Sequence, residues 1–518
     1  MGLFLTGRSV TRLLGIARIL ARHDAGAALE EMGLTGGPLF VLRAFSRRKA
    51  PGRPGQKLAR ALTALGPSFI KLGQSLSTRG DLLGDEIAAD LTQLQDHVGP
   101  FTFAEARATL ERELEAPLEQ LFESFDETPI SAASMAQVHF AVTREEDGRP
   151  GKEVAVKILR PGIEVAFERD LELFAWLAGL AERTQPRLRR LKPREIVALF
   201  AEQVRMEIDL RIEAAGMSEV NENFEGDETY NLPRVDWRRT GRRVLTMTRM
   251  VGTPMDDRQA MIEAGHDLSA VMHKASAIFF HQVFRDGVFH GDQHPGNMGV
   301  DSQGNIFAVD FGILGRLDRK TRFFLADMMV ATLRGDYYRL AEVQVEAGYL
   351  PAGRSLDTYA QALRSVCEPI VGRPLHEISF AKLLRQLFSL TESFQMQVQP
   401  QLLLLQKNMM MAEGISRVLT PDLNIWQMAQ PLIERWIIDN RGPAARVAQT
   451  GHDLQRIMGR VPQFLTDLEA IAAELRGGGL KLHPATLERL ESRRGRGLSW
   501  LALGLATAAL VLSLIAVL

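Results

Sequence analysis

The stretch from His290 to Gly312, HGDQHPGNMGVDSQGNIFAVDFG, constrains this chain more than any other part of it. Two short apolar runs, MGV and IFAV, are joined by the turn-rich sequence DSQGN, which predicts a β-hairpin with its turn at residues 302–305. Such a hairpin returns Asp310 close to Asn297, so a carboxylate and an amide oxygen can converge on one hard cation that also holds phosphate oxygens. Asp292, on the preceding loop, is left free to face the terminal phosphate.

The spacing of these polar residues is also that of protein kinases. Asp292 and Asn297 are five residues apart, as are the Asp and Asn of the kinase catalytic loop, and a DFG sequence follows the hairpin. We therefore expect ATP and Mg²⁺ as ligands, with Asn297 and Asp310 holding the metal. Asp292 would be the catalytic residue, acting as a general base or orienting a hydroxyl or water.

Two histidines in the same stretch raise the alternative of a zinc site. His290 and His294 could bind zinc together with Asp292, but hard oxygen ligands dominate the cluster and no cysteine is near. We therefore expect His294 to pack within the loop or to form a hydrogen bond there.

A lysine and a glutamate elsewhere in the chain complete the kinase pattern. The sequence VAVK ends at Lys157 on a predicted strand, from which a cation can reach the α and β phosphates. Glu213, in the helical segment EIDLRIEAAG, is the natural ion-pair partner. Taken alone, Lys157 also fits an exposed strand end and Glu213 a solvated helix face. The kinase interpretation therefore depends on their order along the chain.

An alanine-rich segment stands where a protein kinase has its glycine-rich phosphate loop. The candidate nucleotide-contacting residues of this segment are Ile130, Ser131, Ala132, Ala133, Ser134, Met135, Ala136, Gln137 and Val138. Alanine allows close approach of a phosphate, but its Cβ disfavours the positive φ angles that glycine permits, so this loop should be stiffer. The two serines could donate hydrogen bonds to phosphate or cap local turns.

The kinase-ordered motifs, together with the hydrophobic periodicity of the segments around them, predict an α+β, two-lobed, protein-kinase-like fold. Its expected parts are a helical N-terminal extension (1–125), an N-lobe (126–252), a largely helical C-lobe (253–490) and a transmembrane anchor (498–518). Alternating apolar residues predict strands at 138–142, 154–158, 231–236, 244–250, 298–300 and 306–309. From residue 268 onward the chain is otherwise expected to be helical.

The C-terminal segment 498–518 predicts the membrane anchor. Its 21 residues carry no charge, and at about 1.5 Å per residue they would span roughly 30 Å, the thickness of a bilayer core. Trp500, near the start of the segment, is a residue type common at the membrane–water interface. By the positive-inside rule, the arginines at 493, 494 and 496 place the preceding domain on the cytoplasmic side, at the inner membrane if the source is bacterial. Gly504 and Ala508 form a small-xxx-small pair that would allow a homodimer.

The rest of the chain offers less specific signals. Residues 3–22 read as a basic amphipathic helix, which fits either an anionic membrane surface or the protein's own core. The formal net charge is -1, which gives no overall field for nucleic acid. The only cysteine, Cys367, excludes an intramolecular disulfide and is expected to be buried.

These motifs together resemble the UbiB/AarF family of atypical, protein-kinase-like proteins, which are linked to ubiquinone biosynthesis. The most distinctive one is KxGQ, here Lys71-Leu72-Gly73-Gln74. The resemblance implies that this helix folds over the site where a kinase takes its peptide. It also implies that Lys71, with Gln74 beside it, meets an ExD motif, here Glu207 and Asp209. The alanine-rich loop belongs to the family pattern, where it is associated with altered nucleotide preference, although this chain has SMAQVH where many relatives have SIGQVH.

The resemblance implies a membrane-anchored kinase or ATPase that handles lipid precursors of ubiquinone. Its expected partners are membrane lipid, polyprenyl quinone precursors and enzymes of ubiquinone biosynthesis. A small-molecule kinase of the choline or aminoglycoside kinase type shares HGDxxxxN, and a non-catalytic scaffold is a further alternative. A protein kinase is disfavoured because no APE-like motif follows Gly312.

Overall fold

This computed structural model describes residues 7–31, 51–77, 83–91, 94, 99–145, 149–184, 192–350, 355–368, 400–421, 423 and 425–441. The contacts discussed below lie within one compact unit, residues 1–437. The anchor predicted at 498–518 lies outside the described residues. Among the residues that are described, no helix is both long enough and apolar enough to span a bilayer.

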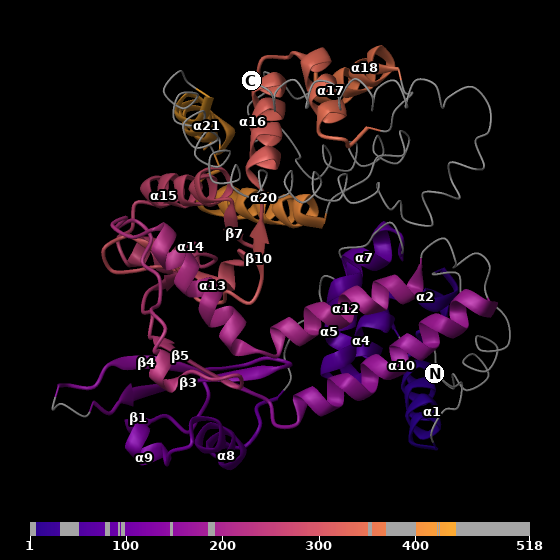
Figure 1. The fold of residues 1–518 in the computed structure, drawn as a ribbon, viewed down its shortest axis with the longest axis vertical. Helices are drawn as coiled ribbons and strands as arrows, with labels where there is room; N and C mark the ends of the chain where they lie inside the picture. The colour runs from indigo at the N-terminus through magenta and orange to yellow at the C-terminus, as the bar shows by residue number, and fades with distance from the viewer. Residues whose placement is uncertain are drawn as a thin grey trace, which may run out of the picture. The chain divides into compact units, whose positions relative to one another are not determined.

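The N-terminal part is helical, as predicted. Its helices are α1 (Gly7–Arg22), α2 (Gly26–Glu31), α4 (Pro54–Leu65), α5 (Pro67–Ser77), α7 (Asp85–Leu91), α8 (Phe103–Leu114) and α9 (Leu118–Leu121). Helices α1, α2, α5 and α7 each contact α4, and α5 also contacts α10 (Ile163–Thr184), which pairs with α12 (Pro193–Glu207) (Figure 1). Gly73 of the KxGQ motif lies in α5, where a Cβ would collide with the side chains of Leu62 and Leu94. The glycine therefore permits close helix packing.

Helix α1 docks on the protein itself, which is one of the two interpretations that the sequence left open. Ile16 is buried in the main hydrophobic cluster, and Leu13, Ile19 and Leu20 pack against it. Arg12 Nη2 lies 3.0 Å from Asp170 Oδ2 on α10, and the Asp170 side chain is only 3% exposed. A buried carboxylate needs such a partner, so the ion pair fixes the helix in place.

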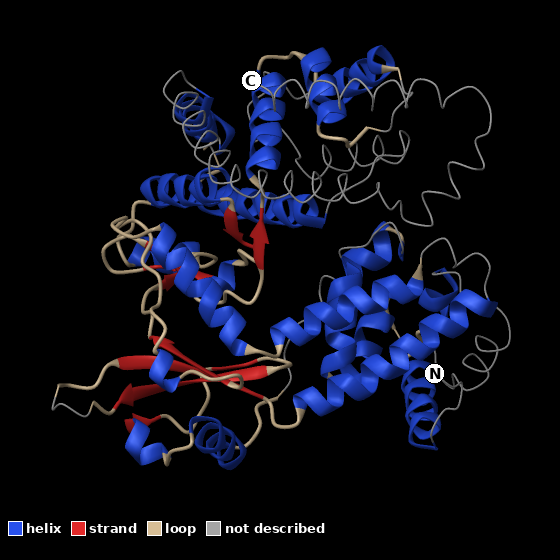
Figure 2. Ribbon diagram, in the orientation of Figure 1, coloured by secondary structure: helices blue, strands red, loops and turns tan. Residues whose placement is uncertain are grey.

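An antiparallel sheet forms the N-lobe (Figure 2). Its strands are β1 (Phe122–Phe125), β2 (Ser131–Ala132), β3 (Ala136–Thr143), β4 (Glu153–Leu159) and β5 (Val244–Thr248), in the order β1-β3-β4-β5, with β2 pairing to β3. Side chains alternate between the two faces of β4. Val154, Val156 and Ile158 therefore join the cluster that contains α8 residues, while Lys157 points to the opposite face, towards α13 (Leu210–Asn223).

The strand predicted at 231–236 is wrong. Within this segment only Val235 makes an isolated bridge, to Met247, and Tyr230 just before it bridges Ile306. Pro233 interrupts it, and proline lacks the N–H that a strand ladder requires.

Short strands and helices form the remaining part. They are β6 (Thr253–Pro254), α14 (Arg258–Glu263), α15 (Leu268–Phe280), the π-helix η2 (His281–Asp286), β7 (Val288–His290), the 3₁₀ turn η3 (Pro295–Asn297), β8 (Met298–Val300), β9 (Ile306–Ala308), β10 (Leu314–Arg316), α16 (Arg319–Leu333), α17 (Tyr337–Glu346), α18 (Leu356–Cys367), α20 (Pro400–Leu419) and α21 (Ile425–Arg441). The β8–β9 hairpin agrees with the sequence. The β7–β10 pair was missed, because three residues are too few for a periodicity to show.

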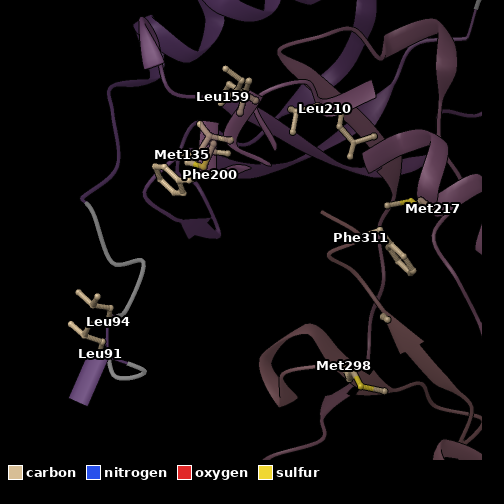
Figure 3. Close-up of a cluster of buried hydrophobic side chains, with 14 of the residues drawn as sticks. Leu91, Leu94, Met135, Leu159, Phe200, Leu210, Met217, Met298 and Phe311 are labelled. Carbon is tan, nitrogen blue, oxygen red and sulfur yellow. The ribbon is translucent and has the colours of Figure 1, made fainter. Parts of the chain in front are cut away.

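One hydrophobic cluster extends from the N-terminal helices to the segment around the DFG sequence. It includes Leu91 of α7, Leu159 of β4, Met217 of α13 and Phe311 (Figure 3). Cys367 is buried at the end of α18, as expected, and burial raises the pKa of its thiol to about 11.

Candidate functional site

Lys157 and Glu213 form the ion pair that their order in the sequence indicated. Lys157 Nζ donates to both carboxylate oxygens of Glu213, at 2.8 and 2.9 Å. The same nitrogen lies 3.6 Å from Asp310 Oδ1. Glu213 is only 6% exposed, so it belongs to the site and not to a solvated helix face.

Lys157, Glu213 and Asp310 shift one another's pKa values. Burial alone would lower the pKa of Lys157, but the carboxylates of Asp310 and Glu213 outweigh it and raise this pKa. The Lys157 charge lowers the pKa of Asp310 to about 2. Burial raises the pKa of Glu213 against the opposing effect of Lys157. At neutral pH the site therefore holds an ammonium group next to an ionised Asp310, whose side chain remains 47% exposed.

The β8–β9 hairpin brings Asn297 close to Asp310, as the sequence predicted. Asp301 Oδ1 accepts hydrogen bonds from the backbone of Gln303 and Asn305, and Gly304 has a φ of +76°, so the turn is closed tightly. After the hairpin, the N–H of Val309 donates to the carbonyl of Asn297 at 3.0 Å.

The donor set suits a hard divalent cation. Asn297 Nδ2 donates to the carbonyl of Asp292 at 3.3 Å, which leaves the Asn297 amide oxygen as an acceptor. Asp310 adds an ionised carboxylate whose Oδ1 accepts from the N–H of Gly312 at 3.0 Å. An amide oxygen and a carboxylate are ligands that fit Mg²⁺ in the company of phosphate oxygens.

Asp292 contacts a lysine that the sequence interpretation missed. Lys407 Nζ, on α20, lies 2.8 Å from Asp292 Oδ1. In the sequence, Lys407 follows the run QLLLLQ and resembles a polar position on an apolar helix, so no local pattern marks it as part of the site.

A buried polar network holds the backbone of the loop around Asp292. Asn408, next to Lys407 and 0% exposed, donates to the carbonyl of His290 at 2.6 Å and accepts from the N–H of Gln293 at 3.3 Å. Gln282, in the π-helix, accepts from the N–H of His290 at 3.1 Å. These bonds satisfy backbone groups of the loop that packing would otherwise leave unpaired.

The two histidines have structural positions. His290 is fully buried, its Nδ1 accepts from the N–H of Asp292 at 3.0 Å, and burial lowers its pKa. His294 accepts from the N–H of Gly296 at 3.1 Å, within the loop as expected. Over the described ranges, no group of three or more His, Cys, Asp or Glu side chains is arranged to hold a metal ion.

The alanine-rich segment forms the β2–β3 hairpin, and its residues have different surroundings. Ser131 and Ala132 form β2, the Ile130 side chain is 62% exposed, and Met135 and Ala136 belong to the main hydrophobic cluster. Val138 lies directly opposite Lys157 in the sheet.

Gln137, which we expected to contact nucleotide, points elsewhere. Its side chain is buried, accepts from the N–H of Phe101 at 3.0 Å and contacts His139 at 2.8 Å. Alternation along β3 explains this, because Gln137 and Val138 must point to opposite faces.

The backbone of the hairpin tolerates alanine. No residue from 130 to 138 has a positive φ, so the absence of glycine causes no strain there. Arg160 holds the turn: its side chain donates to the carbonyls of Ser134 at 3.3 Å and Ala133 at 3.5 Å, and it also bonds the carbonyl of Gly99 at 2.9 Å.

The KxGQ helix meets one of the two ExD residues as expected. Lys71 Nζ lies 2.9 Å from Glu207 Oε2, and the Lys71 charge contributes to lowering the pKa of Asp310. Gln74 Nε2 donates to the carbonyl of Leu94 at 3.4 Å. Asp209 instead accepts from the N–H of Arg211 as the N-cap of α13, and it pairs with the Arg211 side chain at 2.7 Å.

Family models and individual relatives agree on what this chain is similar to. The ABC1 atypical kinase-like domain matches residues 93–344, and the UbiB helical domain matches residues 363–424. A probable protein kinase UbiB from Xanthomonas campestris pv. campestris is 40% identical over 467 residues, covering 88% of this chain and 84% of that protein. Another from Marinobacter nauticus is 40% identical over 514 residues, covering 96% and 93%.

A solved structure shares the fold. The complex of Rv3197 with erythromycin from Mycobacterium tuberculosis superimposes with a TM-score of 0.50 at 24% identity, covering 72% of this chain and 93% of that one. At this identity the likeness concerns the fold, which is an α+β kinase-like fold with a helical N-terminal region.

Proposed function

Because the chain belongs to the UbiB family of atypical kinase-like proteins, we propose that it binds ATP with Mg²⁺ and supports ubiquinone biosynthesis at a membrane. ATP turnover would serve to extract polyprenyl precursors or present them to soluble enzymes. The observation that carries this proposal is the convergence of Lys157, Glu213 and Asp310.

The N-lobe supplies a place for the nucleotide. Lys157 is held by Glu213, so its ammonium is available at a fixed position for the α and β phosphates. Val138 and Ala155 lie on the same face of the sheet as Lys157, and they offer an apolar surface to an adenine ring. Mg²⁺, held by Asn297 and Asp310, would neutralise charge on the phosphates.

Asp292 is the residue that we assign to the reaction itself. An acceptor hydroxyl or water gives its proton to Asp292 while its oxygen bonds to the terminal phosphorus. The electron pair of the broken phosphoanhydride bond leaves on ADP.

The surroundings of the site favour a small or lipid acceptor over a peptide. Lys71 on α5 is paired to Glu207 and lies close enough to influence Asp310 electrostatically. After Gly312 the chain forms β10 and then enters α16 at Arg319, so few residues remain for a peptide-binding activation segment.

ATP hydrolysis by the full-length protein tests this proposal. The rate is measured with liposomes and phenol-like quinone precursors, for the wild type, Asp310→Asn and a control, Asp357→Asn on α18. We expect Asp310→Asn to lose turnover by about 100-fold or more, and the control to keep it. A wild-type rate no higher than that of Asp310→Asn rejects the proposal.

The membrane part of the proposal rests on the uncharged segment 498–518. We propose a tail anchor with the kinase-like domain on the cytoplasmic side, and Gly504 with Ala508 would suit a homodimer contact. A chain that ends before Leu498 should leave the membrane pellet. Its persistence there would shift the assignment to the N-terminal residues.

A further inference from the structure

We propose that Lys407, on α20, is a positioning residue that orients the Asp292 carboxylate for the reaction. Its Nζ lies 2.8 Å from Asp292 Oδ1, and the two residues are 115 positions apart in the sequence. This inference rests on the function proposed above, because it assigns Asp292 the role of proton acceptor.

The position of Lys407 is fixed by its neighbour. Asn408 is fully buried and bonds the backbone of the catalytic loop on both sides of Asp292, at His290 and at Gln293. These two hydrogen bonds set the register of α20 against the loop, so Lys407 is placed at Asp292 by a rigid contact and not by chance on a mobile surface.

The ion pair contributes little to folding. The side chains of Lys407 and Asp292 are 38% and 36% exposed, and pairs this open to solvent typically add little to the stability of a protein. Asn408, by contrast, satisfies buried groups. Loss of the Lys407 charge should therefore leave the fold intact, and a selective effect on turnover would identify a role in the reaction.

The loop itself provides no cation for this purpose. Between Asp292 and Asn297 the sequence is QHPG, without Lys or Arg. Lys407 occupies Asp292 Oδ1, and among the described residues no side chain or backbone group bonds Asp292 Oδ2. Asp292 Oδ2 is thus presented to the acceptor hydroxyl. It takes the hydroxyl proton as the hydroxyl oxygen bonds to phosphorus.

Two variants separate charge from packing in the full-length protein. Lys407→Met removes the charge and keeps most of the volume, while Lys407→Ala also leaves space for a small amine. Lys192→Met is the control, because Lys192 is an exposed lysine directly before α12, paired with Glu195 at 3.0 Å. The ATPase assay is run with and without ethylammonium, and melting temperatures are recorded.

We expect kcat to fall about 10- to 100-fold in both Lys407 variants, while KM for ATP stays within about twofold. Ethylammonium should restore kcat several-fold in Lys407→Ala but not in Lys407→Met. Melting temperatures and the control should match the wild type.

Three results overturn the inference alone: a Lys407→Met kcat within twofold of the wild type, a loss confined to KM, or a Lys407→Ala rate that ethylammonium does not raise. A wild-type rate equal to that of Asp310→Asn removes the proposed function, and this inference with it.

Discussion

Lys71 Nζ on α5 lies 2.9 Å from Oε2 of Glu207, the last residue of α12, and this contact joins the KxGQ helix to the segment that leads into α13. Both side chains are largely buried, at 20% and 10% exposure. The Lys71 charge also acts on Asp310, whose pKa it helps to lower. The helix that distinguishes this chain from ordinary kinases therefore places a cation near the carboxylate that we assign to the metal.

Lys71→Ala should strengthen the binding of Mg²⁺ with ATP. A cation near Asp310 repels an incoming divalent ion, so its removal is expected to lower the half-saturating Mg²⁺ concentration about fivefold, on the order of 1 kcal/mol. Titration of ATP binding with Mg²⁺ measures this value.

Lys57→Ala is the matched control for the Lys71 variant. Lys57 also forms a partly buried ion pair from a neighbouring helix, with Asp24 at 2.7 Å, whereas the charges that lower the pKa of Asp310 belong to Lys157, His290 and Lys71. An equal Mg²⁺ response in the two variants, or none in Lys71→Ala, would remove the KxGQ lysine from the mechanism.

Glu213→Gln should weaken ATP binding. Without the second carboxylate, Lys157 is drawn towards Asp310, 3.6 Å away, and is less available to phosphate, so we expect the Kd for ATP to rise about 10-fold. Glu219→Gln on the same helix removes only a more exposed pair with Arg316 and should stay within about twofold. Calorimetric titration compares them, and equal Kd values would contradict the role of Glu213.

Arg160→Ala should loosen the alanine-rich hairpin. The Arg160 side chain links the carbonyls of Ala133 and Ser134 to that of Gly99. Without it the free turn has more conformational freedom, which is lost when a nucleotide binds. We expect this to cost about 1 kcal/mol, a fivefold rise in the Kd for ATP. Hydrogen exchange of residues 130–138 should increase. Arg144→Ala, near the other end of β3, removes a bond to the Glu119 carbonyl and should leave this exchange unchanged.

Stability should fall below about pH 6.5, the usual pKa of histidine, in part because of His139. Burial lowers the pKa of His139 in the folded protein, so the unfolded chain takes up the proton first as the pH falls. The contribution is complete above the unfolded pKa and is lost as the pH drops through the folded one.

His139→Gln should flatten this dependence. We expect its melting temperature to change less than that of the wild type between about pH 7.5 and about pH 5.5. His273→Gln, at an exposed position on α15, is the control. If the melting temperature of His139→Gln depends on pH as steeply as that of the wild type, other groups cause the effect.

Local sequence determined much of the candidate site. The spacing from Asp292 to Asp310 encodes a hairpin whose turn residues and apolar runs are adjacent in the chain, so the approach of Asn297 to Asp310 follows from short-range chemistry. The same holds for Lys157, because alternation along β4 decides the face on which it lies.

Only the tertiary structure decided the contacts between distant segments. Lys407 reaches Asp292 across 115 residues, and α1 docks through Arg12 and Asp170. Neither contact leaves a local pattern, because each depends on how separately formed helices pack. The sequence by itself determined the chemistry of the site and its local hairpins, while the packing of α5, α12 and α20 decided which charges meet there, since a periodicity identifies a helix face but not its partner.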